Sequence, residues 1–373
     1  MNNTFKILIL FLAAIVVYAC SSGDDSNDAQ QDNFDRGAML VNWADNIIIP
    51  SYTNFKTATE NLNSEVISFT DAPSVSRLQS LRAEWLNTYL EFQKVSMFEI
   101  AKAEEINFRN RLNVYPTNTS EIEQLIADGN YDFSLPSTID AQGFPAMDYL
   151  LHGLGTTDEE ILSFYTTNAN ASNYKAYLLN LSTAIVSLTT TVLDDWVTNY
   201  RTTFVSNTGS SANGSVDKLV NDYLFYYEKA LRAGKVGIPA GVFSGEPLPG
   251  NVEAFYRKDI SKQLLLEALT ATQNFFNGKS ANTNTQGESL QSYLDFLNTI
   301  KNGEDLSALI NNQFDTARNA INGLDNNFVT QIQTNNGQFL STYDELQRNV
   351  VLLKVDMLQA LSIDVDFVDA DGD

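Results

Sequence analysis

The residue types that could carry chemistry gather in one short segment, Gln142–Gly153. If a helix begins near Phe144, then Pro145, Asp148 and His152 follow at spacings of three and four and share one helix face, with Pro145 in the first turn. A carboxylate and an imidazole on one face of a bundle helix could bind a metal or another ligand. The simpler alternative is a helix-surface ion pair worth about 0.2–0.5 kcal/mol.

Charged residues upstream and at the end of the chain are further candidates. Arg111 could pair with Asp148 or hold an anionic ligand, or it could be a structural arginine. The carboxylates of Glu99, Glu104 and Glu105 could supply hard oxygen ligands, although a charged helix face explains them more simply. The aspartates of the tail, residues 364–373, resemble the start of a calcium loop, but the later ligands and the closing glutamate do not follow, so we expect no calcium site there.

Composition excludes several classes of function. His152 is the only histidine, so a zinc-peptidase site with two histidines is excluded by counting. The chain has 46 acidic and 23 basic residues and no basic groove, so nucleic acid is not an expected partner. We find neither a glycine loop for nucleotides after a strand nor a nucleophile elbow.

Apolar residues recur at helical spacing almost everywhere, which predicts an all-α fold. The clearest stripe runs through Val216, Leu219, Val220, Tyr223 and Tyr227. Similar stripes predict helices around residues 40–48, 78–92, 177–200, 290–300, 306–328 and 343–357, and no strand is expected before residue 363.

Helix-capping and helix-breaking residues refine this pattern. Ser120 with Glu123, and Thr157 with Glu160, have the spacing of a capping box, so helices should begin at both places. Pro50 should kink the first helix or divide it. The segment 234–250 holds five glycines and three prolines with several apolar residues, so we expect either a functional loop with apolar residues to bury or a crossover connection.

The N-terminus predicts export and lipid attachment. Lys6 precedes an apolar run, residues 7–17, that is too short to span a bilayer, and Val17–Ala19 leads into Cys20 with the pattern of a lipobox. Cys20 is the only cysteine, so internal disulfides are excluded. Residues 1–19 are therefore the predicted signal peptide, Cys20 the lipidation site and residues 20–33 a flexible tether. Because serine follows Cys20, we expect the outer membrane, with a periplasmic or surface location.

Three segments together resemble the imelysin family. Gln142–Gly153 is similar to its Gly-x-His-x-x-Glu segment, and Arg111–Pro116 is similar to an upstream arginine-to-proline segment. Lys235–Gly241 is similar to its Gly-Ile-Pro loop, and the acidic end of the chain also resembles that of lipoproteins of this family. The resemblance implies two packed helical-bundle domains, here residues 34–165 and 166–363 before the tail 364–373, with a ligand site at their interface. It also implies a role in bacterial iron uptake, or metal-dependent peptide cleavage as in the founding member.

This chain departs from the family motif at its chemical positions. The motif glycine is Gly143, but Pro145 stands at the histidine position and Asp148 at the glutamate position, so one imidazole is lost unless His152 replaces it. We therefore expect a non-catalytic lipoprotein that binds iron, another divalent metal or a small ligand. The expected site residues are Gly143, Pro145, Asp148, His152 and Arg111, and the expected protein partners are envelope uptake proteins. A metallopeptidase with a modified site, and a surface scaffold without a small-ligand site, remain the alternatives.

The lipobox generates a direct test. Replacing Cys20 by serine removes the only predicted covalent anchor and leaves the helical core unchanged, so the Cys20→Ser protein should fold normally and move from the membrane to the soluble fraction. Cell fractionation at high salt measures this. A Cys20→Ser protein that stays with the membranes would contradict lipid attachment.

Overall fold

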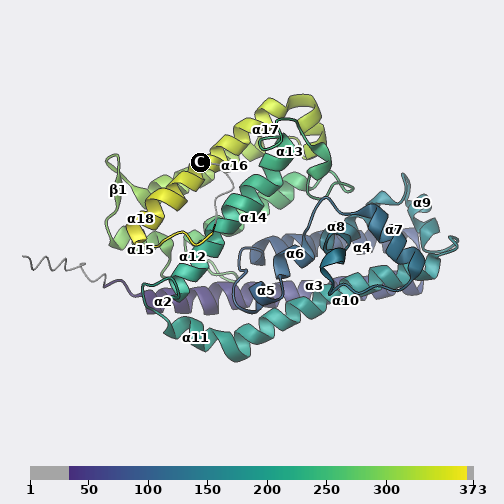
Figure 1. Cartoon of the computed structure of the whole chain (residues 1–373), viewed down its shortest axis with the longest axis horizontal. Helices are drawn as coiled ribbons and strands as arrows, with labels where there is room; N and C mark the ends of the chain where they lie inside the picture. Colours follow the sequence, from purple (N-terminus) through teal and green to yellow (C-terminus); the bar gives the residue numbers. More distant parts are fainter. Residues whose placement is uncertain (1–32, 368–373) are drawn as a thin grey trace, which may run out of the picture. The chain divides into compact units, whose positions relative to one another are not determined.

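The computed structural model describes residues 33–367. The predicted signal peptide, Cys20, nearly all of the predicted tether and the aspartates at 369, 371 and 373 lie outside the described residues. Helices make up most of the remainder, which confirms the all-α prediction (Figure 1).

The helices follow one another in a long series. They are α2 (Arg36–Val41), α3 (Ile49–Asp71), α4 (Val75–Val95), α5 (Lys102–Glu105), α6 (Phe108–Leu112), α7 (Thr119–Asp128), α8 (Gly143–Asp148), α9 (Asp158–Phe164), α10 (Ala171–Asp195), α11 (Arg201–Ser206), α12 (Ser215–Phe225), α13 (Ile238–Ala240), α14 (Ser261–Phe276), α15 (Leu290–Phe296), α16 (Leu306–Asn322), α17 (Phe328–Val351) and α18 (Leu358–Leu361). Segments of π-helical winding extend several of them: Asn42–Ile48, Tyr149–Gly153, Trp196–Tyr200, Tyr226–Gly237 and Leu352–Met357.

The first helical run shows how the chain accommodates Pro50. Asp35 caps α2 by accepting a hydrogen bond of 2.8 Å from the Ala38 amide. The π-helical segment Asn42–Ile48 then leads directly into α3, whose second residue is Pro50. Proline lacks an amide hydrogen but fits the first turn of a helix, so the predicted interruption takes the form of a change in winding.

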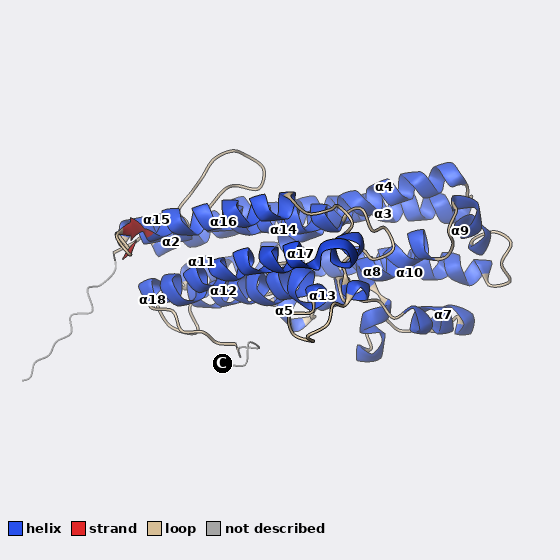
Figure 2. Ribbon diagram, turned by 90° about the horizontal axis from the view of Figure 1, so that it is seen from above, coloured by secondary structure: helices blue, strands red, loops and turns tan. Residues whose placement is uncertain are grey.

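Helix α3 packs along α4 and along α10 (Figure 2). The aromatic residues of their apolar stripes are buried. Phe55, Phe92 and Phe108 meet in the core of this bundle, and Phe144 from α8 stacks on Tyr89 with ring centroids 4.5 Å apart. The run 171–206 is apolar enough to span a membrane by length and composition, but half of its most apolar window is buried within the fold. The predicted boundary at residues 165/166 would separate α10 from its packing partners.

The second group of helices comprises α12, α14, α16 and α17. Tyr227 and Phe276 both pack against Phe314, with ring centroids 5.7 and 6.3 Å apart. Helix α14 also packs against α4, so the two groups of helices are in direct contact. Residues 35–367 accordingly belong to a single compact unit.

Four local predictions can be compared with this structure. The capping box at Thr157 and Glu160 is confirmed, but the helix predicted to begin at Ser120 is capped by Asn118. The helix predicted to reach Ile300 is shorter, because α15 ends at Phe296. After it, β1 (Ile300–Lys301) pairs with β2 (Glu304–Asp305) in an antiparallel hairpin. Its turn is Asn302-Gly303 with positive φ at both residues, a hairpin signal that the helical stripe obscured.

The segment 234–250 also differs from the prediction. Helical winding continues to Ala240, and only the following residues form a loop. The apolar residues expected to be buried are partly exposed, with Phe243 47% and Leu248 36% accessible, so burial of these side chains does not explain the loop. Lys235 and Val236, within the helical part, are buried instead.

Candidate functional site

The motif helix α8 begins where the sequence predicts, and Gly143 determines how it begins. Gly143 has φ +74°, and a Cβ atom added there would lie 2.2 Å from the carbonyl oxygen of Leu112. Only glycine tolerates both the positive φ and this approach of two backbones. Gly143 therefore holds α8 against the segment Arg111–Pro116, which brings two of the three family-like segments together.

A small pocket of about 80 Å³ lies beside this contact. Its walls include Pro145 and Asp148 from α8 and Tyr115 and Pro116 from the upstream segment. The second half of the chain contributes Gly250, Val252, Ala254, Phe255 and Tyr256. The structure thus brings Gly143, Pro145 and Asp148 to one place, although Gly143 contributes backbone geometry and does not line the pocket.

Asp148 is 1% exposed, and its carboxylate is already engaged. One oxygen, Oδ2, accepts a hydrogen bond of 2.8 Å from the Tyr256 amide, and Oδ1 accepts one of 3.0 Å from the Arg257 amide. The Nδ1 atom of His152 lies 3.1 Å from Oδ1. The predicted contact between Asp148 and His152 is present one helical turn apart, but both side chains are largely buried, so it is not an ion pair on the helix surface.

His152 lies behind the pocket wall. Its ring packs against Trp85 with centroids 5.1 Å apart, and its Nδ1 also lies 3.3 Å from the Asp148 carbonyl oxygen. Its Nε2 atom is buried and makes no hydrogen bond within residues 33–367. His152 therefore does not line the pocket next to Pro145.

Arg111 makes a different contact from the predicted pairing with Asp148. Its Nη2 donates a hydrogen bond of 3.2 Å to the carbonyl oxygen of Phe133. Partial burial lowers the pKa of Arg111, and nearby Asp132 opposes that shift. Because the guanidinium holds a backbone carbonyl, this geometry favours the structural alternative for Arg111.

A buried ion pair next to the pocket was not among the candidates from sequence. Lys235 and Glu253 are 3% and 2% exposed, and the Lys235 ammonium donates to the Glu253 carboxylate and, at 2.9 Å, to Gln93. Glu253 also accepts hydrogen bonds of 2.8 Å from Asn113 and 3.1 Å from the Tyr89 hydroxyl. Burial lowers the pKa of Lys235, while Glu253 opposes the shift.

This cluster marks the edge of a second cavity of about 250 Å³. Gln93, Asn113, Tyr115 and Lys235 line it, and Tyr115 also lines the smaller pocket. The signal available in sequence was the lysine within the Gly-Ile-Pro segment. Nothing local indicated that Glu253 would be its partner.

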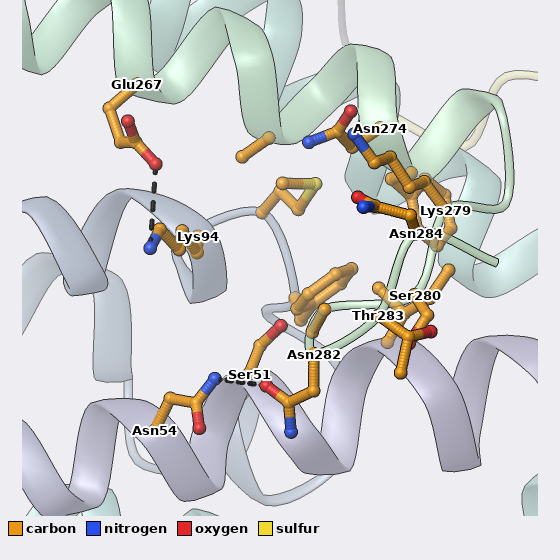
Figure 3. A pocket seen from close by; sticks show the side chains of 16 residues that line it. Ser51, Asn54, Lys94, Glu267, Asn274, Lys279, Ser280, Asn282, Thr283 and Asn284 are labelled. Atoms are coloured by element: carbon orange, nitrogen blue, oxygen red, sulfur yellow. Dashed lines mark hydrogen bonds and ion pairs between the residues drawn. The ribbon is translucent and has the colours of Figure 1, made fainter. Parts of the chain in front are cut away.

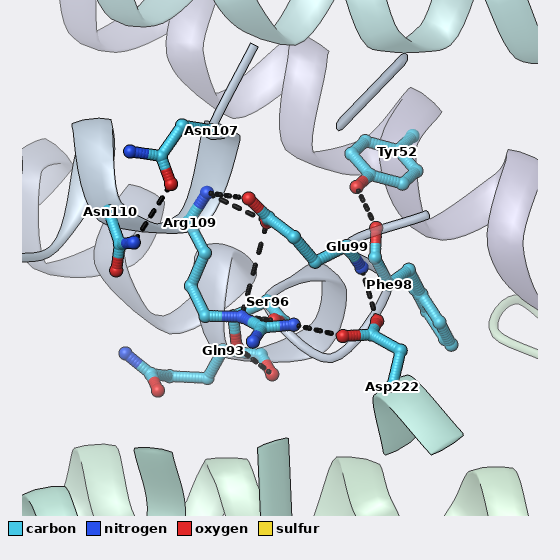
Figure 4. Close-up of polar contacts among 9 residues, drawn as sticks. All are labelled: Tyr52, Gln93, Ser96, Phe98, Glu99, Asn107, Arg109, Asn110 and Asp222. Carbon is cyan, nitrogen blue, oxygen red and sulfur yellow. Dashed lines mark hydrogen bonds and ion pairs between the residues drawn. The ribbon is translucent and has the colours of Figure 1, made fainter. Parts of the chain in front are cut away.

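Glu99 belongs to a separate buried cluster with Arg109 and Asp222 (Figure 4). The Arg109 amide donates to Glu99 Oε2 at 2.8 Å, and Arg109 Nη2 donates to Asp222 Oδ1 at 2.8 Å. Burial raises the pKa of Glu99 to about 7, against the opposing effect of Arg109. Glu105, by contrast, is exposed and pairs with Lys102, which fits the charged face expected there. Glu104 is likewise exposed.

The residues present do not fit a transition-metal site of the family type. Both Asp148 oxygens accept backbone amides, Pro145 offers no donor atom, and the Nδ1 atom of His152 faces Asp148. Within residues 33–367 no group of three or more histidine, cysteine, aspartate or glutamate residues could hold a metal ion.

These features define a helical protein with a motif pocket between two halves of the chain, and comparison identifies the family. The imelysin family model matches residues 48–353, so the chain belongs to the imelysin family. No curated protein sequence matches it.

Two solved structures have the same fold. One, from Parabacteroides distasonis, is assigned as an iron-regulated protein A precursor; it is 17% identical, with a TM-score of 0.69 over 86% of this chain and 95% of that one. An imelysin-like protein from Psychrobacter arcticum is 16% identical, with a TM-score of 0.69 over 89% of this chain and 97% of that one. At these identities the likeness establishes the fold alone.

The backbone approach at Gly143 can be tested by one methyl group. Gly143→Ala forces a left-handed alanine against the Leu112 carbonyl, so we expect a loss of about 2 kcal/mol or more in the free energy of unfolding by urea titration. Gly209→Ala is the matched control, because an added Cβ there meets no atom within 4 Å; it should change stability by about 0.5 kcal/mol at most. Equal effects of the two substitutions would show that the close approach is unimportant.

The buried Glu99 carboxyl predicts a pH-dependent difference in stability. Its folded pKa, about 7, exceeds its ordinary value of 4.5, so the stability that protonated Glu99 contributes is complete below 4.5 and is lost as pH rises through 7. Glu99→Gln cannot titrate. Between about pH 5 and about pH 8 the free energy of unfolding of Glu99→Gln should therefore rise relative to that of the parent, by up to about 3 kcal/mol. Its melting temperature should rise over the same range. The control Glu105→Gln, at an exposed carboxylate, should show a constant difference from the parent, and a constant difference for Glu99→Gln would refute the prediction.

Proposed function

We propose that this imelysin-family protein is a non-catalytic, lipid-anchored binding component of an iron-uptake system in the outer membrane. Membership of the family supports the general role. The iron-regulated assignment of the Parabacteroides distasonis relative points in the same direction, although it describes that protein. Lipid attachment rests on the lipobox at Cys20.

One observation carries the non-catalytic part of the proposal: the Asp148 carboxylate is used to hold the Tyr256 and Arg257 amides. Metal-assisted peptide hydrolysis requires a metal held by several side chains, with a position left for water. Here the motif carboxylate has a structural task, and the motif imidazole is replaced by Pro145. The ligand site is the pocket lined by Tyr115, Pro145 and residues 254–256, with Gly143 fixing its wall.

The first experiment removes the gene in its host and measures accumulation of radioactive iron under iron limitation. We expect reduced accumulation, restored by the parent gene. The Pro145→Trp variant, which fills the pocket of about 80 Å³, should restore less, whereas Gly209→Trp at an open position should restore fully. Unchanged iron accumulation in the deletion strain would contradict an uptake role and favour a scaffold.

A second experiment tests the degenerate metal site. Protein purified without chelator or nickel affinity should neither bind zinc tightly by titration calorimetry nor cleave unfolded casein. The double change Pro145→His with Asp148→Glu supplies two ligand types three residues apart on one helix face, so it should bind zinc measurably more tightly than the parent. Chelator-sensitive cleavage of casein by the parent would instead support the peptidase.

A further inference from the structure

A pocket of about 390 Å³ lies away from the motif helix and shares no lining residue with the motif pocket. Its walls come from α3, the end of α4, α14 and the loop 278–287 (Figure 3). The apolar side chains Met97, Phe98 and Phe275 form its base, and each is 1% exposed. We call it the asparagine-rich pocket, because the amides that line it are Asn54, Asn274, Asn282 and Asn284.

The loop that forms one wall is fixed in place. The Asn42 amide donates hydrogen bonds to the Gly278 carbonyl at 3.1 Å and to the Glu288 carbonyl at 3.0 Å, at the two ends of the loop. Between them the Ala281 amide donates to the Asn46 carbonyl at 2.9 Å, and Asn54 donates to Asn282 at 2.8 Å. Because the wall is held at both ends and at its tip, the pocket exists before any ligand binds, which lowers the entropic cost of binding.

Several polar groups face the pocket without hydrogen-bond partners among residues 33–367. Ser51 is 5% exposed, and its hydroxyl, which points into the pocket in Figure 3, makes no hydrogen bond within residues 33–367. Asn274, Lys279 and Asn284 gather on the opposite side, and within the described part of the chain their side chains also make none. These groups are reached from the pocket, so a ligand that enters it meets hydrogen-bond donors and acceptors that are not engaged with other side chains or the backbone.

The chemistry of the lining side chains suits a ligand rich in hydroxyl groups. A sugar hydroxyl both donates and accepts hydrogen bonds, and asparagine amides and serine hydroxyls do the same. The charges are largely balanced, because Lys94 lies 2.6 Å from Glu91 and 3.7 Å from Glu267, which leaves Lys279 as a further donor. The net charge of −23 opposes an anionic ligand. The volume falls in the range of about 300–1,000 Å³ usual for small-molecule sites.

We propose that the asparagine-rich pocket binds a neutral mono- or disaccharide, whose vicinal hydroxyls bond to Ser51 on one side and to Asn274, Lys279 and Asn284 on the other. This site is independent of the proposed iron-uptake role, since it uses other residues and another chemistry. A protein with both sites would hold a sugar and its iron-related ligand at once.

The test is saturation-transfer NMR of the purified chain with glucose, galactose, N-acetylglucosamine and maltose, each at millimolar concentration, with gluconate as the anionic comparison. We expect transfer to at least one neutral sugar and none to gluconate. The double variant Asn274→Ala with Asn284→Ala removes two unpaired amides and should weaken that binding at least tenfold, while Asn312→Ala, an exposed amide on α16 outside the pocket, should leave it unchanged.

A second variant guards against loss of folding. Ala271→Phe places a ring in the pocket from α14 and should abolish sugar binding, while an unchanged melting temperature shows that the fold survives. Three results would overturn the proposal: no neutral sugar binds, gluconate binds instead, or sugar binding persists in the folded double and Ala271→Phe variants. Each is independent of iron accumulation, so failure here leaves the proposed uptake role untouched.

Discussion

The buried pair between Lys235 and Glu253 constrains the arrangement of the whole site. Removing two charges from water costs several kcal/mol for each ion, and the cost is recovered only when their remaining hydrogen-bonding groups are satisfied. Here Tyr89 and Gln93 from α4, together with Asn113, supply those bonds. Any relative movement of the two halves that separated Asn113 from Glu253 would leave a charged group under-satisfied in the interior, so this pair fixes their register.

The position of the motif pocket follows from that register. Glu253 begins the segment whose amides at Tyr256 and Arg257 reach Asp148, and Gly143 sets the distance of α8 from the segment that carries Asn113. Four contacts therefore lie close together although their partners are far apart in the sequence. They join Asn113 to Glu253, the Tyr256 and Arg257 amides to Asp148, and Gly143 to Leu112. The family motif in this chain contributes a wall and an anchor for the backbone, and its original chemical groups are replaced by Pro145 and Asp148.

The sequence predicted what depends on local pattern. Stripes of apolar residues identified most of the helices, and the Thr157 box and the start of α8 were correct because a cap and a helical period need only a few neighbouring residues. Spacing alone also predicted that Asp148 and His152 would touch. It could not predict the Tyr256 and Arg257 amides as partners, since they lie more than 100 residues away and are backbone groups. The pairing of Lys235 with Glu253 is not predicted either, because these side chains are 18 residues apart and no helical spacing connects them. The Asn302-Gly303 turn lies where a helical stripe overlaps it.

The double attachment of residues 253–257 has a consequence for selectivity. Glu253 is held by the ion pair and the amides of Tyr256 and Arg257 by Asp148, so this stretch is anchored at both ends and cannot swing as a gate without breaking charged hydrogen bonds. In the proposed function, the motif pocket would therefore select its ligand by size at a fixed opening. A molecule too large for the space beside Pro145 would be turned away at the surface without any closing motion.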